Sequence, residues 1–225
     1  MIEAGRVRVN GTARRDPEWP VSLQRDRVEV DEKPVHAEAR VYLMLNKPRG
    51  LVTSLSDERG RATVLDCLAG LKLPFVSPVG RLDKASEGLL LFTNDTAWAA
   101  RLTAPESEVE KVYHVQIDRV ADNELARQLE MGTVVEGESL AARRVAVLRA
   151  GEQNSWLEMV LAEGKNRHIR RLLEALGINV LRLIRVAIGP LALGNLAKGQ
   201  ARELTDKEVA ALEPGSLPGR LQAGR

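Results

Sequence analysis

The hydrophobic pattern at the start of the chain alternates over short runs, which indicates β-strands. In residues 6–9 and 27–30, valine alternates with charged residues, and this period of two is expected for a half-exposed strand. The first run ends at Asn10-Gly11, a dipeptide that favours a tight hairpin turn. Pro34 and the weakly patterned residues that follow it predict a linker. We therefore expect a small β unit at the start of the chain.

The rest of the chain alternates predicted strands with predicted helices. Apolar runs predict strands at 41–45 and 89–92, and the second run is typical of a strand covered on both faces. Further strands are expected at 112–117, 145–148 and 156–161. Helices are expected after a cap at Asn94 or Asp95, after a cap at Asp122, and after the capping box formed by Thr205 and Glu208.

The clearest helix is predicted between residues 166 and 176. Its apolar side chains have the i, i+3, i+4, i+7 spacing of one buried face, and they are Ile169, Leu172, Leu173 and Leu176. Gly177 is well placed to end the helix. Three arginines lie off that face and close to one another, namely Arg167, Arg170 and Arg171.

Composition places the chain among soluble globular proteins. Of its 225 residues, 44% are hydrophobic and 28% are charged. No apolar run is long enough to cross a bilayer, and the N-terminus lacks the apolar core of a signal peptide. The single cysteine, Cys67, excludes an internal disulfide and suits a reducing compartment. We expect a cytoplasmic protein that does not associate with membranes, with a monomer as the default state.

The distribution of charge is more informative than the net charge of +2. Residues 163–185 contain six Lys or Arg and two Glu, and residues 1–15 contain four Arg and one Glu. Such basic zones can bind phosphates even in a nearly neutral protein, because the local electrostatic field, rather than the net charge, governs this interaction. On charge alone, however, a solvated helix face is the better explanation.

The candidate chemistry is concentrated in residues 78–88. Asp83 lies between Arg81 and Lys84, in a loop bracketed by proline and glycine that runs into the apolar strand at 89–92. The two cations would hold Asp83 in its ionised form, and an ionised carboxylate can attack an electrophilic carbon. On these three residues alone, a loop salt bridge is the better explanation.

A longer pattern surrounds Asp83, namely Gly80-Arg81-Leu82-Asp83 and Glu87-Gly88-Leu89-Leu90-Leu91-Phe92-Thr93-Asn94-Asp95. It resembles the signature of the RsuA family of ribosomal RNA pseudouridine synthases. Four further segments are similar to motifs of the family in the same order, over about residues 41–204. They are Asn46-Lys47-Pro48-Arg49-Gly50, Glu110-Lys111-Val112-Tyr113, Glu163-Gly164-Lys165-Asn166-Arg167-His168-Ile169-Arg170-Arg171 and Ile188-Gly189-Pro190-Leu191. Ser86 stands where the family usually has threonine, and His168 where glutamine is usual.

The resemblance implies a fold and an activity. The fold is the pseudouridine synthase fold of the α+β class, with a mixed, mainly antiparallel central sheet, flanking helices and an active-site cleft. The activity is isomerisation of uridine in ribosomal RNA or a pre-ribosomal particle, with the base flipped out, and it needs no cofactor and no metal. Asp83 is then the nucleophile, Arg81 positions it, Lys165 pairs with it, and Tyr113 stacks on the target base. The residues expected to contact RNA are Lys47, Arg49, Arg61, Lys84, Arg167, His168, Arg170, Arg171, Arg6 and Arg8.

The start of the chain resembles the later half of an S4 RNA-binding domain, on residues 2–11 and 26–31. The earlier half, which would contain the first helices, is absent from this sequence, so either the true start lies upstream or the module is degenerate. We therefore expect a partial S4-like module at 1–35, a catalytic domain at 40–213 and a flexible tail at 214–225.

Two other functions fit parts of the sequence. A non-catalytic RNA-binding or ribosome-assembly protein is compatible with the S4-like segment and the basic helix. A glycosidase is disfavoured, because such enzymes need two acids that flank the scissile bond. The near neighbours of Asp83 are cations, and Glu87 is the only close acid.

Overall fold

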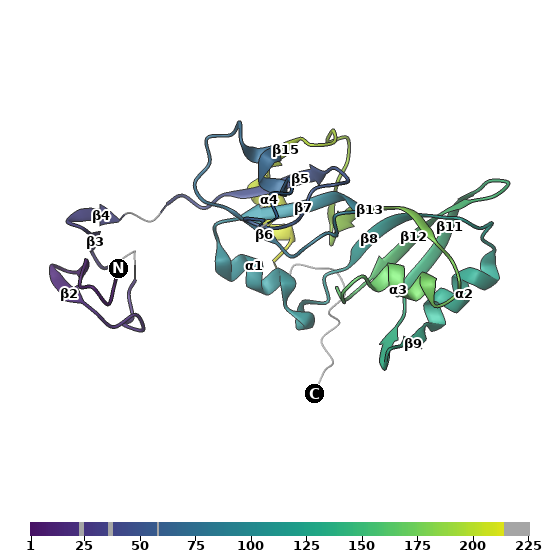
Figure 1. Ribbon diagram of the computed structural model, residues 1–225, viewed down its shortest axis with the longest axis horizontal. Coiled ribbons are helices and arrows are strands. Elements are labelled where there is room, and N and C mark those ends of the chain that lie inside the picture. Colours follow the sequence, from purple (N-terminus) through teal and green to yellow (C-terminus); the bar gives the residue numbers. More distant parts are fainter. Residues whose placement is uncertain (23–24, 36–37, 58, 214–225) are drawn as a thin grey trace. The chain divides into compact units, whose positions relative to one another are not determined.

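The computed structural model of the protein describes residues 1–22, 25–35, 38–57 and 59–213, in two compact units that divide between Arg40 and Val41 (Figure 1). The tail expected at 214–225 lies outside the described residues. Among the residues that are described, no helix is both long enough and apolar enough to cross a membrane.

The first unit is a four-stranded antiparallel sheet in the order β2-β1-β3-β4. Its strands are β1 (Val7–Val9), β2 (Thr12–Arg14), β3 (Val28–Val30) and β4 (Lys33–Val35). The predicted alternating runs are confirmed as β1 and β3. Asn10 and Gly11 both have positive φ, as a two-residue turn between β1 and β2 requires. The linker prediction is wrong at Pro34, which lies in the edge strand β4, where a missing N–H is tolerated.

The second unit is built on a nine-stranded sheet. Seven strands follow one path, in the order β11 (Arg144–Ala150), β12 (Ser155–Leu161), β8 (Lys111–Ile117), β13 (Val180–Ile188), β7 (Glu87–Thr93), β5 (Tyr42–Lys47) and β15 (Ala201–Glu203). Two short strands pair beside that path, β6 (Ser77–Val79) with β7 and β14 (Leu191–Ala192) with β13. The pairing of β7 with β13 is parallel and the other pairings of this sheet are antiparallel. The predicted mixed, mainly antiparallel sheet is confirmed.

One half of the sheet is covered on both faces. Every residue of β7 is buried, as its uninterrupted apolar run predicts. Leu89 and Leu91 pack on one face with α1 (Thr96–Thr103) and residues next to α4 (Asp206–Ala211). Leu90 and Phe92 pack on the other face with the 3-10 helix η1 (Val64–Leu68).

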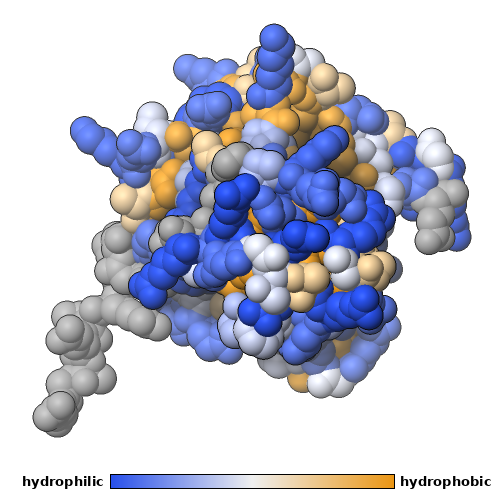
Figure 2. All heavy atoms as spheres, turned by 90° about the vertical axis from the view of Figure 1, so that its left-hand side faces the viewer, coloured by the Kyte–Doolittle hydropathy of each residue, from blue (hydrophilic) through white to orange (hydrophobic). Residues whose placement is uncertain are grey.

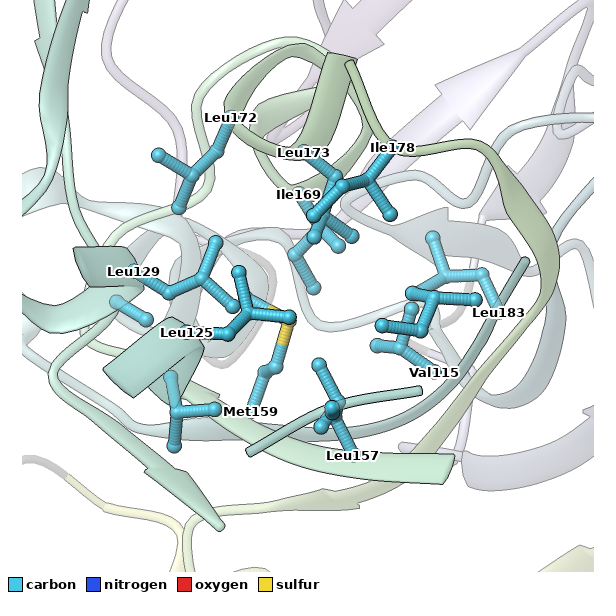
Figure 3. Close-up of a cluster of buried hydrophobic side chains, with 14 of the residues drawn as sticks. Val115, Leu125, Leu129, Leu157, Met159, Ile169, Leu172, Leu173, Ile178 and Leu183 are labelled. Atoms are coloured by element: carbon cyan, nitrogen blue, oxygen red, sulfur yellow. The ribbon is translucent and has the colours of Figure 1, made fainter. Parts of the chain in front are cut away.

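The other half of the sheet buries one face. Val115 and Leu157 alternate inward from β8 and β12, and they meet side chains from α2 (Asn123–Met131) and α3 (His168–Glu174) (Figure 3). Leu125 of α2 and Leu173 of α3 are drawn in the same cluster. This core fixes the position of α3 against the sheet.

Most helix predictions are confirmed with their caps. Asp95 accepts a hydrogen bond from Trp98 N at the start of α1, and Asp122 caps α2 in the same way. The capping box of Thr205 and Glu208 begins α4. The hairpin of β9 (Thr133–Val135) and β10 (Glu138–Leu140) and the 3-10 helices η1 and η2 (Pro105–Ser107) were not predicted. In the view of Figure 2, hydrophilic residues cover most of the surface and hydrophobic residues gather towards the upper part.

Candidate active site

A cavity of about 620 Å³ lies in the second unit, where β7 and β13 run parallel. Its wall includes the loop before β7, the end of α1, the start of β8, the segment entering α3, and β13. The lining residues are Val79–Asp83, Ser86, Leu91, Leu102–Pro105, Lys111, Tyr113, Leu161–Arg170, Leu183, Arg185 and Ile188. A volume of this size is typical of small-molecule sites and has room for a nucleotide.

Asp83 lies on this wall in a loop that is fixed from both sides. The preceding Leu82 is buried, and Thr53 Oγ1 donates to its carbonyl at 2.7 Å. Gly50 N donates to the carbonyl of Lys84 at 2.7 Å. The Asp83 side chain itself is 35% exposed, so it is accessible from the cavity while its backbone is held in place.

Lys47 is the central support of this loop, which corrects its expected role in RNA contact. Its side chain has no exposed surface. Its Nζ donates to the carbonyls of Pro48, Asp83 and Ser86 at 3.1, 3.2 and 2.8 Å. Burial lowers the pKa of Lys47 to about 8, against the attraction of Asp83 and Glu87, and the three carbonyls also favour the charged form. A buried ammonium that is fully hydrogen-bonded cannot reach a nucleic acid.

The cation next to Asp83 is Arg170, whose Nε lies 4.0 Å from Asp83 Oδ2. The Arg170 side chain is 13% exposed, and its Nη2 donates to the carbonyl of Ala85 at 3.3 Å. Burial lowers the pKa of Arg170, Asp83 opposes this, and the positive charges of Arg167 and Arg49 add to it. Arg170 of α3 therefore contacts the Asp83 loop through both its charge and its hydrogen bond.

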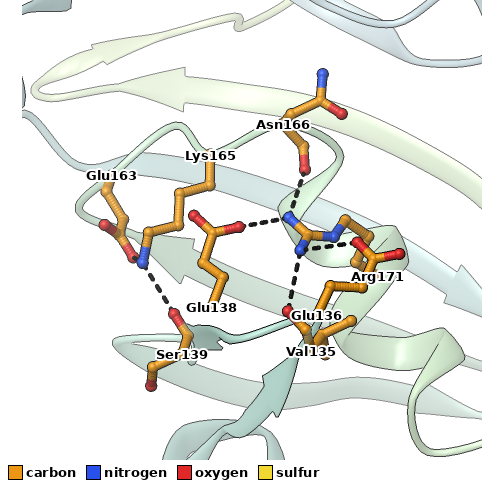
Figure 4. Close-up of polar contacts among 8 residues, drawn as sticks. All are labelled: Val135, Glu136, Glu138, Ser139, Glu163, Lys165, Asn166 and Arg171. Carbon is orange, nitrogen blue, oxygen red and sulfur yellow. Dashed lines mark hydrogen bonds and ion pairs between the residues drawn. The ribbon is translucent and has the colours of Figure 1, made fainter.

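Lys165 was expected to pair with Asp83, and the structure contradicts this. Its Nζ lies 2.7 Å from Glu163 Oε1 and donates to the carbonyl of Ser139 at 2.8 Å (Figure 4). Ser139 belongs to the hairpin β9–β10. Lys165 therefore joins this hairpin to the cavity rim.

Arg171 and His168 were expected to contact RNA, but Arg171 is paired within the fold and His168 is buried. Arg171 lies 2.6 Å from Glu138 and 3.4 Å from Glu136, and donates to the carbonyl of Val135 (Figure 4). Its guanidinium therefore joins α3 to the hairpin β9–β10. His168 is 3% exposed, and burial lowers its pKa, which leaves its ring inside the fold.

The remaining cations of the expected RNA surface are exposed. Arg81, Lys84, Arg49 and Arg167 have exposed side chains around the Asp83 loop and the start of α3, and Arg81 and Arg167 line the cavity. Arg61 pairs with Asp57 at 2.5 Å, in an exposed loop. In the first unit, Arg6 forms an ion pair with Asp31, and Arg8 is exposed.

Tyr113 and Lys111 lie two positions apart on β8, so both face the cavity. Tyr113 is half-buried and is paired across the sheet with Arg185 of β13. Gly88 of β7 adopts φ +101°, and a Cβ there would lie 2.2 Å from the Arg185 carbonyl. Only glycine therefore allows β13 to approach β7 this closely.

The cavity wall contains a concentration of buried polar atoms that have no hydrogen-bond partner. Among the described residues there are eight such side-chain atoms, and five belong to cavity-lining residues. They are Ser86 Oγ, His168 Nδ1, His168 Nε2, Arg170 Nε and Arg185 Nη2. Unpartnered buried polar groups are costly, so this arrangement is typical of a site for a polar ligand.

Comparison with known proteins identifies the family. The family model of RNA pseudouridylate synthase matches residues 41–175. The chain belongs to this family. Its enzymes are isomerases that convert uridine in RNA to pseudouridine.

Similar proteins cover most of the chain. "Ribosomal large subunit pseudouridine synthase B" of Bacillus subtilis (strain 168) is 36% identical, over 94% of this chain and 87% of that protein. An "Uncharacterized RNA pseudouridine synthase" of Aquifex aeolicus is 37% identical, over 94% and 85%. The solved "Crystal structure of pseudouridylate synthase" superposes with a TM-score of 0.66 at 28% identity, over 94% of this chain and 90% of that one.

Some site residues of this pseudouridine synthase were missed from the sequence, although signals for them exist. Lys111 shares the face of Tyr113 by simple alternation on one strand. Arg185 is one of two arginines in the otherwise apolar strand β13, and the other, Arg182, pairs with Glu87. A charge in such a strand is a reason to look for a site.

Proposed function

We propose that this protein isomerises a specific uridine of ribosomal RNA to pseudouridine, with Asp83 as its nucleophile. The observation that supports this most strongly is the placement of Asp83. Its carboxylate lies on the wall of a nucleotide-sized cavity, 4.0 Å from a guanidinium, in a loop fixed by Lys47 and Thr53. Preorganised groups of this kind favour attack on a bound substrate.

The reaction breaks the bond between ribose C1′ and base N1 and forms a bond between C1′ and base C5. Asp83 attacks either the sugar or the base and is released at the end. The proton of C5 leaves and N1 gains one, so the isomerisation is neutral in electrons. Tyr113 is half-buried on the wall, where its ring can stack on the base.

The target base must leave its helix to enter the cavity. Flipping costs a few kcal/mol of stacking, so contacts inside the cavity have to replace those that are lost. Exposed Arg81 lies at the cavity wall two residues before Asp83. We assign it to the space that the flipped nucleotide leaves behind.

Ribosomal RNA is proposed as the substrate because of the names of the relatives, of which the Bacillus subtilis protein is named for the large subunit. Exposed Arg49, Lys84 and Arg167 around the Asp83 loop and the start of α3 are suited to phosphate contacts that position the RNA. Because ribosomal RNA is made in the cytoplasm of bacteria, we also propose that location.

We further propose that residues 1–35 form a partial S4-like RNA-binding module. Exposed Arg8, and Arg14 stacked 3.8 Å above the Trp19 ring, support a nucleic-acid contact. Because Arg6 is paired with Asp31, we expect it to contribute less to RNA binding than Arg8. In the full chain, Arg8→Ala should weaken RNA binding without changing turnover at saturating RNA.

The test of the catalytic proposal uses Asp83→Asn, which preserves shape and removes the nucleophile. Ribosomal RNA labelled with tritium at uridine C5 releases tritium when C5 loses its proton. The native protein is expected to release it and Asp83→Asn to release none, and retained turnover would end the proposal. Mapping pseudouridine in ribosomal RNA from a strain without this gene identifies the target.

A further inference from the structure

Two cations on one wall of the cavity have no acidic partner among the residues that the structure describes. Arg185 on β13 is 6% exposed, its Nε donates to the Leu89 carbonyl at 2.7 Å, and it lines the cavity. Its Nη2 is buried and has no hydrogen-bond partner among the residues that the structure describes. Lys111 lines the same wall from the neighbouring strand β8.

Burial, and then the positive charge of Arg185, lower the pKa of Lys111 to about 8. The two groups therefore act on each other as like charges in a poorly solvated place. Bringing two cations together away from water is unfavourable unless a third group offsets their charge.

The acids of the cavity already have cations of their own. Asp83 faces Arg170 at 4.0 Å, and Glu163 pairs with Lys165 at 2.7 Å. Within the described part of the chain, neither Lys111 nor Arg185 takes part in any ion pair. A ligand anion is the group that would satisfy both.

We propose that Lys111 and Arg185 form a subsite for a backbone phosphate of the RNA, one that flanks the target uridine. The inference rests on the proposed function, because that function brings a nucleotide into this cavity. A phosphodiester accepts several charge-assisted hydrogen bonds at once, which matches an ammonium beside a free guanidinium nitrogen.

Such a subsite explains how the reacting sugar is placed. A flipped nucleotide turns about its own backbone, so holding a flanking phosphate limits where ribose C1′ can lie. Tyr113 stands on β8 two residues from Lys111 and opposite Arg185 in the sheet. The phosphate contact and the stacking contact therefore come from the same two strands.

The first experiment measures the preference for a phosphate directly in the full chain. Isothermal titration calorimetry compares uridine, uridine 3′- and 5′-monophosphate, and inorganic phosphate. One charge-assisted contact corresponds to about tenfold in affinity, so at least one monophosphate should bind the native protein about tenfold more tightly than uridine.

Three variants test which residues are responsible for the preference for a monophosphate over uridine. Lys111→Met keeps the length of a half-buried side chain and removes its charge, and Arg185→Lys keeps the charge and removes the forked donors. Lys207→Met on the exposed face of α4 is the matched control. Thermal unfolding first checks that each variant is folded.

The preference for the monophosphate should fall to about one- to twofold in Lys111→Met, fall partly in Arg185→Lys, and stay unchanged in the control. A preference that survives in Lys111→Met overturns the proposal. So does an equal loss of affinity for uridine and its monophosphate, because that would indicate a packing role. Inorganic phosphate that binds as tightly as the monophosphate would assign the site to free anions and overturn the link to RNA.

The second experiment uses ribosomal RNA as substrate and separates this inference from the proposed function. Lys111→Met should raise KM about tenfold and lower the salt slope of RNA binding by about one unit, with a smaller effect on kcat. If the native protein forms no pseudouridine yet prefers the monophosphate, the function fails and the subsite stands. If Asp83-dependent turnover is normal and Lys111→Met matches the native KM, the subsite alone fails.

Discussion

Replacing Arg170 tests which cation supports Asp83. The family resemblance assigned that role to Lys165, whereas the structure places Arg170 Nε 4.0 Å from Asp83 Oδ2 and joins Lys165 to Glu163 and Ser139. Arg170→Met removes the charge and the hydrogen bond to the Ala85 carbonyl. Lys165→Met removes a cation of the same cavity wall that does not contact Asp83.

The size of the effect follows from the geometry. Two unit charges 4.0 Å apart interact with about 4 kcal/mol at an effective dielectric constant of 20. Asp83 is 35% exposed, and solvent screening reduces this to about 1–3 kcal/mol. If the contact is needed to orient Asp83 for the proposed attack, Arg170→Met loses roughly 10- to 100-fold in rate.

Single-turnover tritium release from uridine-labelled RNA measures that rate without a contribution from product release. Arg170→Lys should recover part of the loss, since it restores the charge without the fork. Lys165→Met should lose less than about threefold, as expected for an exposed pair. A larger loss in Lys165→Met than in Arg170→Met would refute the assignment.

Three further predictions concern stability and binding. Arg182 and Lys198 pair with Glu87 and lower the pKa of its carboxyl group from 4.5 to about 2, and the Glu87 side chain is 4% exposed. The ionised carboxylate should therefore contribute about 3 kcal/mol to the free energy of unfolding above pH 4.5, and this contribution is lost as the pH falls towards 2. Urea unfolding of Glu87→Gln should show a flatter pH dependence, and an unchanged one would contradict this. Gly88→Ala should lose at least about 3 kcal/mol, because the new Cβ meets the Arg185 carbonyl at 2.2 Å. A urea midpoint near that of the native protein would disprove the close approach. Arg167→Ala should lower the salt slope of RNA binding by about one unit, while Arg171→Ala should leave it unchanged because its guanidinium is already paired. Equal slopes in the two variants would show that the cluster acts as one surface.

Local patterns predicted much of the fold because the responsible forces are local. The caps of α1, α2 and α4 follow from the side chain at one position and the backbone two or three residues later. The buried strand β7 follows from its apolar run. The hairpin β9–β10 was missed, because residues 133–140 contain few apolar positions and are held by Arg171 and Lys165 from a distant part of the chain.

The roles of some site residues were assigned wrongly because these roles depend on contacts with distant parts of the chain. Lys165 and Arg170 lie in one motif, and their roles depend on how the chain turns into α3. Arg167 adopts a left-handed conformation with φ +49° just before that helix, after which Arg170 faces Asp83 while Lys165 reaches the hairpin. Since the hairpin was not predicted, neither was the partner of Lys165.

The burial of Lys47 could have been predicted from the sequence. Alternation along β5 places it on the face of Leu43 and Leu45, which is buried against η1. A cation at the end of an apolar strand was instead read as exposed. Its burial is explained only by the three carbonyls that the loop brings to it.

Glu87 and the pair of cations Lys111 and Arg185 should respond oppositely to substitution. Glu87 is buried with cations that neutralise it, so its removal should lower stability. Lys111 and Arg185 line the same cavity wall and have no acidic partner among the described residues, so an apolar residue at position 111 should raise stability while it weakens RNA binding. Opposite changes in stability and binding would show that the positive charge of this wall is retained for the ligand, because the fold alone gains nothing from it.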